Sequence, residues 1–538
     1  MILFNKIFLA LNKHQIIFTA VCILLAFLAK LSGVLGRYRV EYAEELFLIL
    51  IFLSIPFLNI KVKEFLNPIK FLYRGTVSIF LFYLVWLLLF KIVSGTFIIT
   101  EQKSLWLLTC VGCATASLFR LIFPVLLVPA FEFYKASIAK SSGFHVSEVD
   151  YIAVSDFLIV LTFGMLITAI LRRVENFKSI PDMFCRIWGS FNRGTIEKDK
   201  YFSKENCIVI FSISVHFCNY LYSAYEKVSA SMVVGENWVT VNETQNLFHI
   251  AKVTYSTPLV YLPPNLLDLL TSYLDMPYVS VLINMIVVVI QIMSIFFFLS
   301  RKFAAILTLA FDLSHIGIFI LTGIFFWKWI ILNLLITATL TKLPSWNAYS
   351  VAKISLPVMV ISPFLFTITF LGWFDARAWN DEYFQLELEN RSTIRLPSNY
   401  FFDDSVTVAQ QSFMEGVNGT FHTRTWGFFK GEEQISLNEI NRCDSYRDNG
   451  ELLNDEKILN FMSNVINQYE LLERRLGVNW VGLHLLYPHH IWSFNNPFGD
   501  DFSIDNVTAI SLIYEPKCLR QGNWQVIDRI EMLRLEVE

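Results

Sequence analysis

The sequence predicts a polytopic α-helical membrane protein with a C-terminal α+β domain outside the cytoplasm. Of its 538 residues, 55% are hydrophobic and 16% aromatic, and the mean hydropathy is +0.50. A soluble domain of this length is much less apolar, whereas several membrane-spanning helices produce this composition. Charged residues become frequent only after about Asp375. We therefore expect a transmembrane domain over residues 1–375 and a soluble domain over 376–538.

Ten apolar runs in the first part are candidate spans, since a spanning helix needs about 20 apolar residues. The 104–133 run is interrupted by Arg120 and Pro124, which predicts a broken or re-entrant helix, and the short 44–60 run contains Pro56. The expectation is therefore about eight to ten spans. The runs are 16–36, 44–60, 76–97, 104–133, 151–171, 207–225, 278–300, 303–324, 326–342 and 352–374.

Basic residues predict the orientation. Segment 172–204 is rich in lysine and arginine, so the positive-inside rule places it in the cytoplasm. Counting spans forward puts 230–276, Lys328 and everything after Trp373 outside. A simple count backward would place the basic segment 61–74 outside, which conflicts with the positive-inside rule. A re-entrant 104–133 run would remove this conflict.

The external loop 231–276 contains a stretch at 262–273 that resembles a helix lying on the membrane surface. Such a loop can be a lid or entrance for a lipid-like ligand. It can equally be a structural cover over the bundle, and the sequence leaves both open.

The soluble domain reads as a sheet covered by one long helix. Residues 383–396 alternate in polarity as a strand pair does, with a turn at Asn390, and 455–476 has helical spacing. Further strands are expected at 481–487, 509–514 and 531–537. Cys443 and Cys518 are the two cysteines of this part, and they can form a disulfide in an oxidising compartment.

No metal site and no nucleic-acid interface are predicted. Cys110 and Cys113 form a CxxC without a second pair or a nearby histidine, and the pair His489–His490 lacks a third ligand at suitable spacing. The net charge of −3 argues against nucleic-acid binding through a basic patch.

Stretch 211–238 holds the main chemical candidate. It begins as a span and carries Glu226 and Lys227 near its far end. An ionisable residue within a span is functional by default. A lysine at a helix end also commonly extends to the membrane interface, or pairs with a neighbouring carboxylate such as Glu226.

Two histidines in spans are further catalytic candidates. His216 precedes Lys227 by eleven residues, so the two lie about three turns apart on roughly the same helix face. His315 follows Asp312 by one turn. In the pair of His315 and Asp312, the carboxylate can hold the imidazole in one tautomer or help it to relay a proton. Alternatively, the pair can form a hydrogen bond between helices.

Three patches resemble the vitamin K-dependent γ-carboxylase-like superfamily, whose bacterial members are called HTTM (horizontally transferred transmembrane) proteins. Tyr220-x3-Ala224-x2-Lys227-Val228, followed by Trp238, is similar to the family signature Y-x3-G-x2-K-L…W. Residues 296–335 resemble its helix, basic turn and histidine-bearing helix, with His315 in the histidine's place. Residues QYELLERRLGVNWVGLHLLYPHHIWSFNN resemble its helix-then-strand segment. The likeness runs from about 205 to 500, with a membrane core at about 205–345.

The resemblance implies a multi-pass protein of the bacterial inner membrane, in contact with membrane lipid. By this resemblance, Lys227 would be the base that deprotonates reduced vitamin K or another quinol. Tyr220 and Trp238 would bind that cofactor. The substrate would be an exported peptide or protein, which would gain CO₂ at a glutamate. A non-catalytic relative assisting maturation, export or immunity, or a subunit of an envelope complex, is the alternative. A transporter is the third, although no internal repeat is visible.

Overall fold

The computed structural model describes most of the chain after residue 42. The described residues are 43–142, 149–173, 204–234, 237–242, 244–246, 249, 257–344, 346–366, 373–375, 378–409, 413, 426–428, 452, 454–476, 487–492, 503–520 and 523–537. The predicted run at 16–36 and most of the basic segment 172–204 therefore lie outside them.

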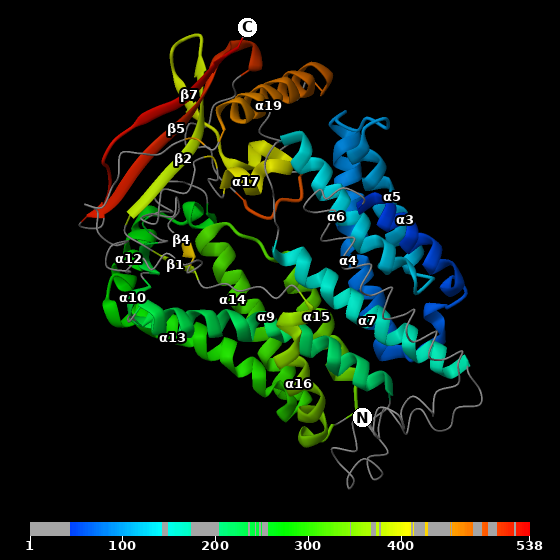
Figure 1. Ribbon diagram of the computed structural model, residues 1–538. Coiled ribbons are helices and arrows are strands. Elements are labelled where there is room, and N and C mark those ends of the chain that lie inside the picture. Colours follow the sequence, from blue (N-terminus) through cyan, green and yellow to red (C-terminus); the bar gives the residue numbers. More distant parts are fainter. Residues whose placement is uncertain are drawn as a thin grey trace.

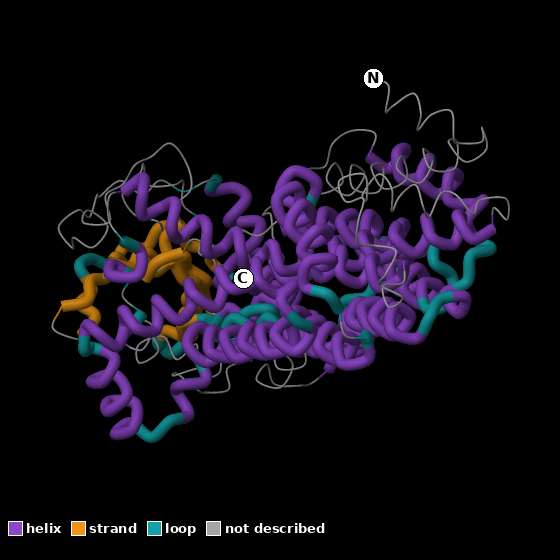
Figure 2. Tube along the Cα trace, turned by 90° about the horizontal axis from the view of Figure 1, so that it is seen from below, coloured by secondary structure: helices purple, strands orange, loops and turns teal. Residues whose placement is uncertain are grey.

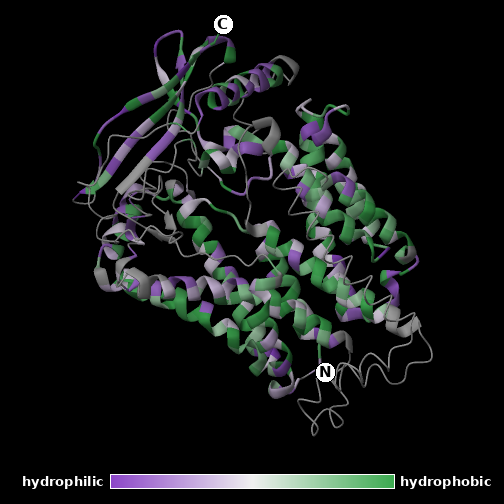
Figure 3. Ribbon diagram, in the orientation of Figure 1, coloured by the Kyte–Doolittle hydropathy of each residue, from purple (hydrophilic) through white to green (hydrophobic). Residues whose placement is uncertain are grey.

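A bundle of apolar helices forms the larger part of the molecule, and a sheet of mixed polar and apolar residues sits at one end of it (Figure 1 and Figure 3). Among the described residues, five helices are long and apolar enough to cross a membrane: Asn67–Val93, Tyr151–Ala169, Asn206–Ser229, Tyr278–Leu299 and Arg301–Thr322. They confirm the prediction of several apolar helices of spanning length, and the expected count of eight to ten spans stays a prediction. The bundle helices are α3 (Ala43–Ser54), α4 (Asn67–Val93), α5 (Gln102–Ser117), α6 (Phe123–Ser142), α7 (Val149–Arg173), α9 (Lys204–Val234), α13 (Pro277–Met293), α14 (Arg301–Thr322), α15 (Trp327–Lys342) and α16 (Ala348–Leu365).

The 104–133 run is broken at the predicted place. It folds as the two packed helices α5 and α6, and the turn between them pairs with the segment before α4. There the Leu121 amide donates to the Ile60 carbonyl at 3.2 Å, and Arg120 forms a strand-like bridge with Lys61. Because α5 leads to this end and α6 leads away from it, one apolar run contributes two helices.

With this hairpin, Lys61 lies at the end of the bundle opposite the C-terminal domain. Lys91, near the C-terminal end of α4, forms an ion pair with Asp403 of the C-terminal domain. Lys61 precedes the N-terminus of the same helix, about 40 Å away along its axis. Arg301 and Lys342 also lie at the end away from the C-terminal domain, because α14 and α15 reach that domain with their opposite ends. Lys61, Arg301 and Lys342 thus lie at the end of the bundle away from the C-terminal domain, whereas Lys91 and Lys328 lie at the end that contacts it.

α9 is the central helix of the bundle and packs on α7, α13 and α16. Its contact with α7 depends on Gly164, where an added Cβ would lie 2.6 Å from the Ile208 side chain. A larger residue at 164 would push the two helices apart, so glycine lets α9 pack deep in the bundle.

The loop after α9 folds back over the bundle. It contains α10 (Trp238–Val241), the 3-10 turn η4 (Pro258–Tyr261) and α12 (Pro264–Leu274). Asn284 on α13 accepts hydrogen bonds from Asn242 at 2.9 Å and Thr244 at 2.8 Å, which ties the loop down. The helix expected within 262–273 is confirmed as α12.

The described residues of the C-terminal domain form a five-stranded antiparallel sheet, with a helix against it (Figure 1 and Figure 2). Its strands are β2 (Ala378–Leu388), β3 (Thr393–Arg395), β5 (Val507–Arg520), β6 (Asn523–Val526) and β7 (Ile530–Glu536), and β5 pairs with β2, β6 and β7. The hairpin predicted over 383–396 is β2–β3. The predicted helix is α19 (Asp455–Leu476), which packs Phe461 5.5 Å from Phe384 of the sheet. β1 (Trp373–Asp375) and β4 (Trp426–Phe428) form a separate pair.

Cys518 on β5 is disulfide-bonded, as expected for one member of the predicted pair. Cys443 lies outside the described residues, as does most of the strand predicted at 481–487.

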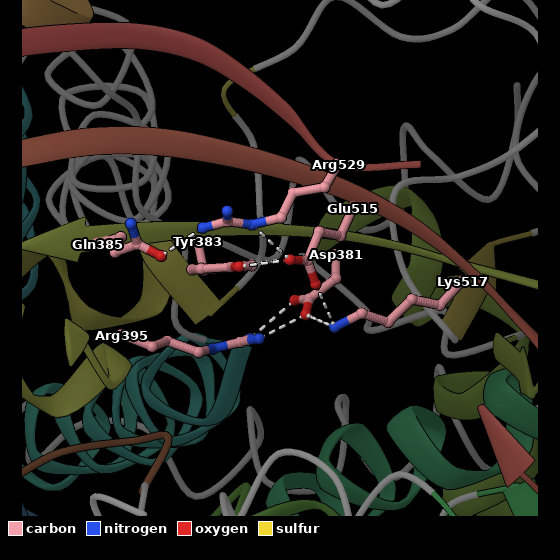
Figure 4. A network of polar contacts seen from close by, with 7 residues as sticks. All are labelled: Asp381, Tyr383, Gln385, Arg395, Glu515, Lys517 and Arg529. Carbon is pink, nitrogen blue, oxygen red and sulfur yellow. Dashed lines mark hydrogen bonds and ion pairs between the residues drawn. The ribbon is translucent and has the colours of Figure 1, made fainter. Parts of the chain in front are cut away.

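The other face of the sheet carries a network of charges (Figure 4). The carboxylate of Asp381 is fully buried and accepts from Arg395 at 2.5 and 2.8 Å and from Lys517 at 2.7 Å. Glu515 pairs with Lys517 at 2.9 Å and accepts from the Tyr383 hydroxyl at 2.7 Å. Burial raises the pKa of Asp381, but the two cations outweigh it, and the net pKa is lowered from its ordinary value.

The two parts are joined through the turn between α14 and α15. Gly323 ends α14 with a φ of 76°, a conformation that glycine adopts without strain. Its carbonyl accepts from the Trp492 amide at 2.9 Å, and the Phe325 amide donates to the His490 carbonyl at 2.7 Å. Ile324 and Ile491 thereby form a strand-like bridge between the bundle and the C-terminal domain.

Candidate functional site

A buried polar cluster lies where α9, α14 and α15 meet. Each helix contributes two side chains about one turn apart, a spacing that places both on the same face. All six residues are at most 5% exposed. We call this set the buried polar cluster: His216 and Tyr220 from α9, Asp312 and His315 from α14, and Trp329 and Asn333 from α15.

Asn333 links the three helices. Its Nδ2 donates to Asp312 Oδ1 at 2.8 Å and to the Tyr220 hydroxyl at 3.0 Å. Its Oδ1 lies 2.8 Å from His216 Nε2. The hydrogen bond between Asn333 and Asp312 shows that Asp312 makes an interhelical contact, which is one of the two alternatives that the sequence left open.

Aromatic rings surround these polar groups. Tyr220 stacks on Phe311 with centroids 3.6 Å apart and planes 4° from parallel. The His315 ring lies 5.1 Å from Phe326 and 5.2 Å from Trp329. Phe326 in turn contacts His490 at 5.2 Å, so the cluster connects to the C-terminal domain through one ring.

Four polar atoms of the cluster are buried without a hydrogen-bond partner among the described residues. Nearly all buried polar groups in proteins are hydrogen-bonded. Four such atoms in one cluster are therefore a functional signal. They are His216 Nδ1, Asp312 Oδ2, His315 Nδ1 and Trp329 Nε1.

Lys227 lies farther along α9 on the same face. Its side chain is 1% exposed, so it does not extend to solvent. Its Nζ donates to the Ser223 carbonyl at 3.3 Å and lies 5.3 Å from the centroid of the Trp238 ring. Seven residues separate it from Tyr220, which corresponds to about 10 Å along the axis.

The structure thus sorts the predicted site residues into two groups. His216, Tyr220 and His315 come together in the buried polar cluster, and Lys227 and Trp238 form a second contact nearer the C-terminal end of α9. Asn333 and Trp329 are cluster members that the sequence interpretation missed. A lone asparagine within the apolar run WIILNLLITATL was the available signal, because an amide in such a run needs a partner.

The residues considered for metal binding lie outside the buried polar cluster. Cys110 and Cys113 are free thiols on α5. The ring of His489 packs against Trp492 at 5.2 Å. Within the described part of the chain, no group of three His, Cys, Asp or Glu side chains could hold a metal ion.

No protein-family profile matches this chain, and no curated protein or solved structure is similar to it.

Proposed function

We propose that this chain is a multi-pass membrane enzyme of the γ-carboxylase-like type, in which Lys227 is the base, a quinol is the cofactor and an exported peptide or protein is the substrate. The burial of Lys227 carries the proposal. An amine can act as a base only when it is uncharged, and surroundings without water favour that form.

The arrangement of charge supports an extracytoplasmic C-terminal domain. Lys61, Arg301 and Lys342 lie at the end of the bundle opposite that domain, and basic residues mark the cytoplasmic side of bacterial membrane proteins. Lys91 and Lys328 lie at the other end, but both are buried, Lys91 in an ion pair with Asp403 and Lys328 over the Tyr83 ring. The disulfide at Cys518 supports the same orientation, because disulfides persist in oxidising compartments. Lys227 then lies toward the outer end of α9, on the side from which an exported substrate would approach.

The side chains near Lys227 fit a neutral aromatic ligand. Trp238 offers an aromatic ring, and Ser223 and Ala224 are small, buried residues one turn earlier on α9. Tyr220 is less suited to direct contact than the sequence suggested, because its ring stacks on Phe311 and its hydroxyl bonds to Asn333. Trp238 is therefore the stronger candidate for holding a quinol ring.

Each of these residues has a defined task in the proposed reaction. Nζ of Lys227 takes a proton from a hydroxyl group, and Trp238 shields the resulting ammonium from solvent and stabilises it through its ring face. A bound quinol supplies, on oxidation by O₂, the driving force for replacing the γ-hydrogen of glutamate by CO₂. Water is excluded by the bundle, which protects a basic intermediate from protonation.

The test is quinol-dependent carboxylation by the purified full chain in lipid nanodiscs. Reduced vitamin K, O₂, labelled bicarbonate and a glutamate-rich peptide are supplied, and both quinol epoxide and labelled peptide are measured. We expect Lys227→Met to lower both products by at least about 100-fold, a typical contribution of general base catalysis. Lys342→Met, at an exposed lysine near the other end of the bundle, is the matched control and should leave both unchanged.

Two results would overturn the proposal. One is a Lys227→Met variant with the wild-type rate. The other is a folded wild-type protein that makes neither product, which would favour the non-catalytic role in maturation, export or envelope assembly. Thermal unfolding of each variant separates loss of activity from loss of the fold.

A further inference from the structure

We infer that Asn333 and Asp312 are positioning residues that hold the His216 ring in the tautomer protonated on Nε2, so that Nδ1 accepts a proton from a neutral hydroxyl-bearing ligand inside the bundle. This inference deepens the proposed function. It rests on the proposed function only for what happens to the proton after His216 has accepted it. The proton acceptor itself follows from the hydrogen bonds of the buried polar cluster.

The first step concerns the amide of Asn333. A primary amide has two N–H donors on its nitrogen and only acceptor capacity on its oxygen. Both donors are in use, toward Asp312 Oδ1 at 2.8 Å and the Tyr220 hydroxyl at 3.0 Å. An ionised Asp312 can only accept a hydrogen bond, so its contact with Nδ2 fixes the amide orientation, and Oδ1 faces His216.

The second step concerns the imidazole. An amide oxygen cannot donate, so the 2.8 Å contact between Asn333 Oδ1 and His216 Nε2 requires a proton on Nε2. A neutral imidazole carries one N–H, so Nδ1 holds a lone pair. Nδ1 is buried and has no hydrogen-bond partner among the described residues.

The third step concerns the ligand. The His216 and Trp329 rings are neighbours, with centroids 6.1 Å apart, and the indole nitrogen of Trp329 can only donate. A hydroxyl group complements this pair, because it gives a proton to Nδ1 and accepts a hydrogen bond from Nε1–H. A charged ligand does not suit walls formed by Tyr220, Phe311 and Phe326.

The proton transfer is balanced within the cluster. The O–H bond of the ligand breaks, an Nδ1–H bond forms on His216, and the electron pair stays on the ligand oxygen. The imidazolium still donates from Nε2 to Asn333, and the carboxylate of Asp312 offsets its charge through the amide. His216 precedes Lys227 by about 16 Å along α9, so this acceptor is distinct from the proposed base.

The experiment is solid-state NMR of the full chain in nanodiscs with histidine labelled by ¹⁵N in the ring, and His216→Gln assigns the signals. We expect the wild type to show His216 with Nε2 protonated and Nδ1 unprotonated. Asn333→Leu and the nearly isosteric Asp312→Asn should each give a mixture of tautomers. Asn284→Leu, at a buried asparagine of α13 outside the cluster, should keep the single tautomer.

Addition of phenol tests the ligand. It should shift the Nδ1 signal of His216 in the wild type and not in Trp329→Phe, whereas anisole, which lacks the O–H, should shift neither. A wild-type ring protonated on Nδ1, a pure tautomer in Asp312→Asn, or equal shifts with phenol and anisole would each overturn the inference. None of these measurements depends on quinol turnover. This inference can therefore be refuted while the proposed function holds, and the reverse is also possible.

Discussion

The charge network of the C-terminal sheet and the buried polar cluster of the bundle contain similar groups, but they differ in how many of their polar atoms are paired. In the sheet, both carboxylate oxygens of Asp381 are paired with cations, and Glu515 bonds to Lys517 and to the Tyr383 hydroxyl (Figure 4). In the bundle, Asp312 has one bonded oxygen, and His216 has one bonded nitrogen.

The difference separates a structural use of buried polar groups from a functional one. A buried network in which every member is satisfied makes one conformation specific, but it has no capacity left for a ligand. A cluster with unused donors and acceptors gives up some stability and keeps groups available for chemistry. We therefore expect mutations in the sheet to act on folding and mutations in the bundle to act on activity.

The largest effect on folding is expected from Asp381→Ala. The change leaves Arg395 and Lys517 without their shared carboxylate, and removing one partner from a buried ion pair costs about 3–5 kcal/mol of unfolding free energy. Urea denaturation followed by the fluorescence of the C-terminal domain measures it. Arg534→Ala, which breaks exposed pairs with Glu387 and Glu536, is the matched control and should cost at most about 1 kcal/mol. Equal losses in the two variants would mean that Asp381 is not the centre of the network.

Acid should weaken the sheet in a defined range. The pKa of Asp381 is lower in the folded protein than its ordinary value of about 3.9, because the cations outweigh burial. The folded state therefore binds fewer protons than the unfolded state, so this contribution to stability is fully present above about pH 4 and is lost as the pH falls through the folded pKa. The urea midpoint of the wild type should fall more steeply below pH 4 than that of Asp381→Asn, and parallel curves would contradict the assignment.

The smallest effect on folding is expected from His315→Phe. The new ring keeps the packing against Phe326 and Trp329 and removes Nδ1, which has no hydrogen-bond partner among the described residues. Because none of the hydrogen bonds described for the cluster is broken, we expect the unfolding free energy to change by less than about 1 kcal/mol. Thermal unfolding in nanodiscs measures this change. A loss above about 2 kcal/mol would show that His315 belongs with the structural group.

Short sequence patterns predicted the elements whose structure depends mainly on neighbouring residues. The bounds of α19 followed from the helical spacing at 455–476, and the β2–β3 hairpin followed from the alternation over 383–396, although β2 begins earlier, at Ala378. The break in the 104–133 run followed from a charge and a proline in an apolar run. In each case neighbouring residues decide the outcome.

The arrangement of the site depends on contacts that no short pattern encodes. His216 meets Asn333 across α9 and α15, residues far apart in the sequence, so Asn333 could be noticed as a lone amide but not placed. The burial of Lys227 depends on a loop that returns Trp238 over the end of its own helix. Sequence reasoning identified most of the chemically able residues, and tertiary packing decided which of them became neighbours.

The bridge between Ile324 and Ile491 bears on biosynthesis. A ribosome releases the chain from its N-terminus, so α14 and α15 are made well before residues 487–492. Until that segment has been made and has paired with Gly323 and Phe325, the turn beside the buried polar cluster lacks these backbone hydrogen bonds. This end of the bundle is thus completed late, which delays assembly of the site until the C-terminal domain has been made.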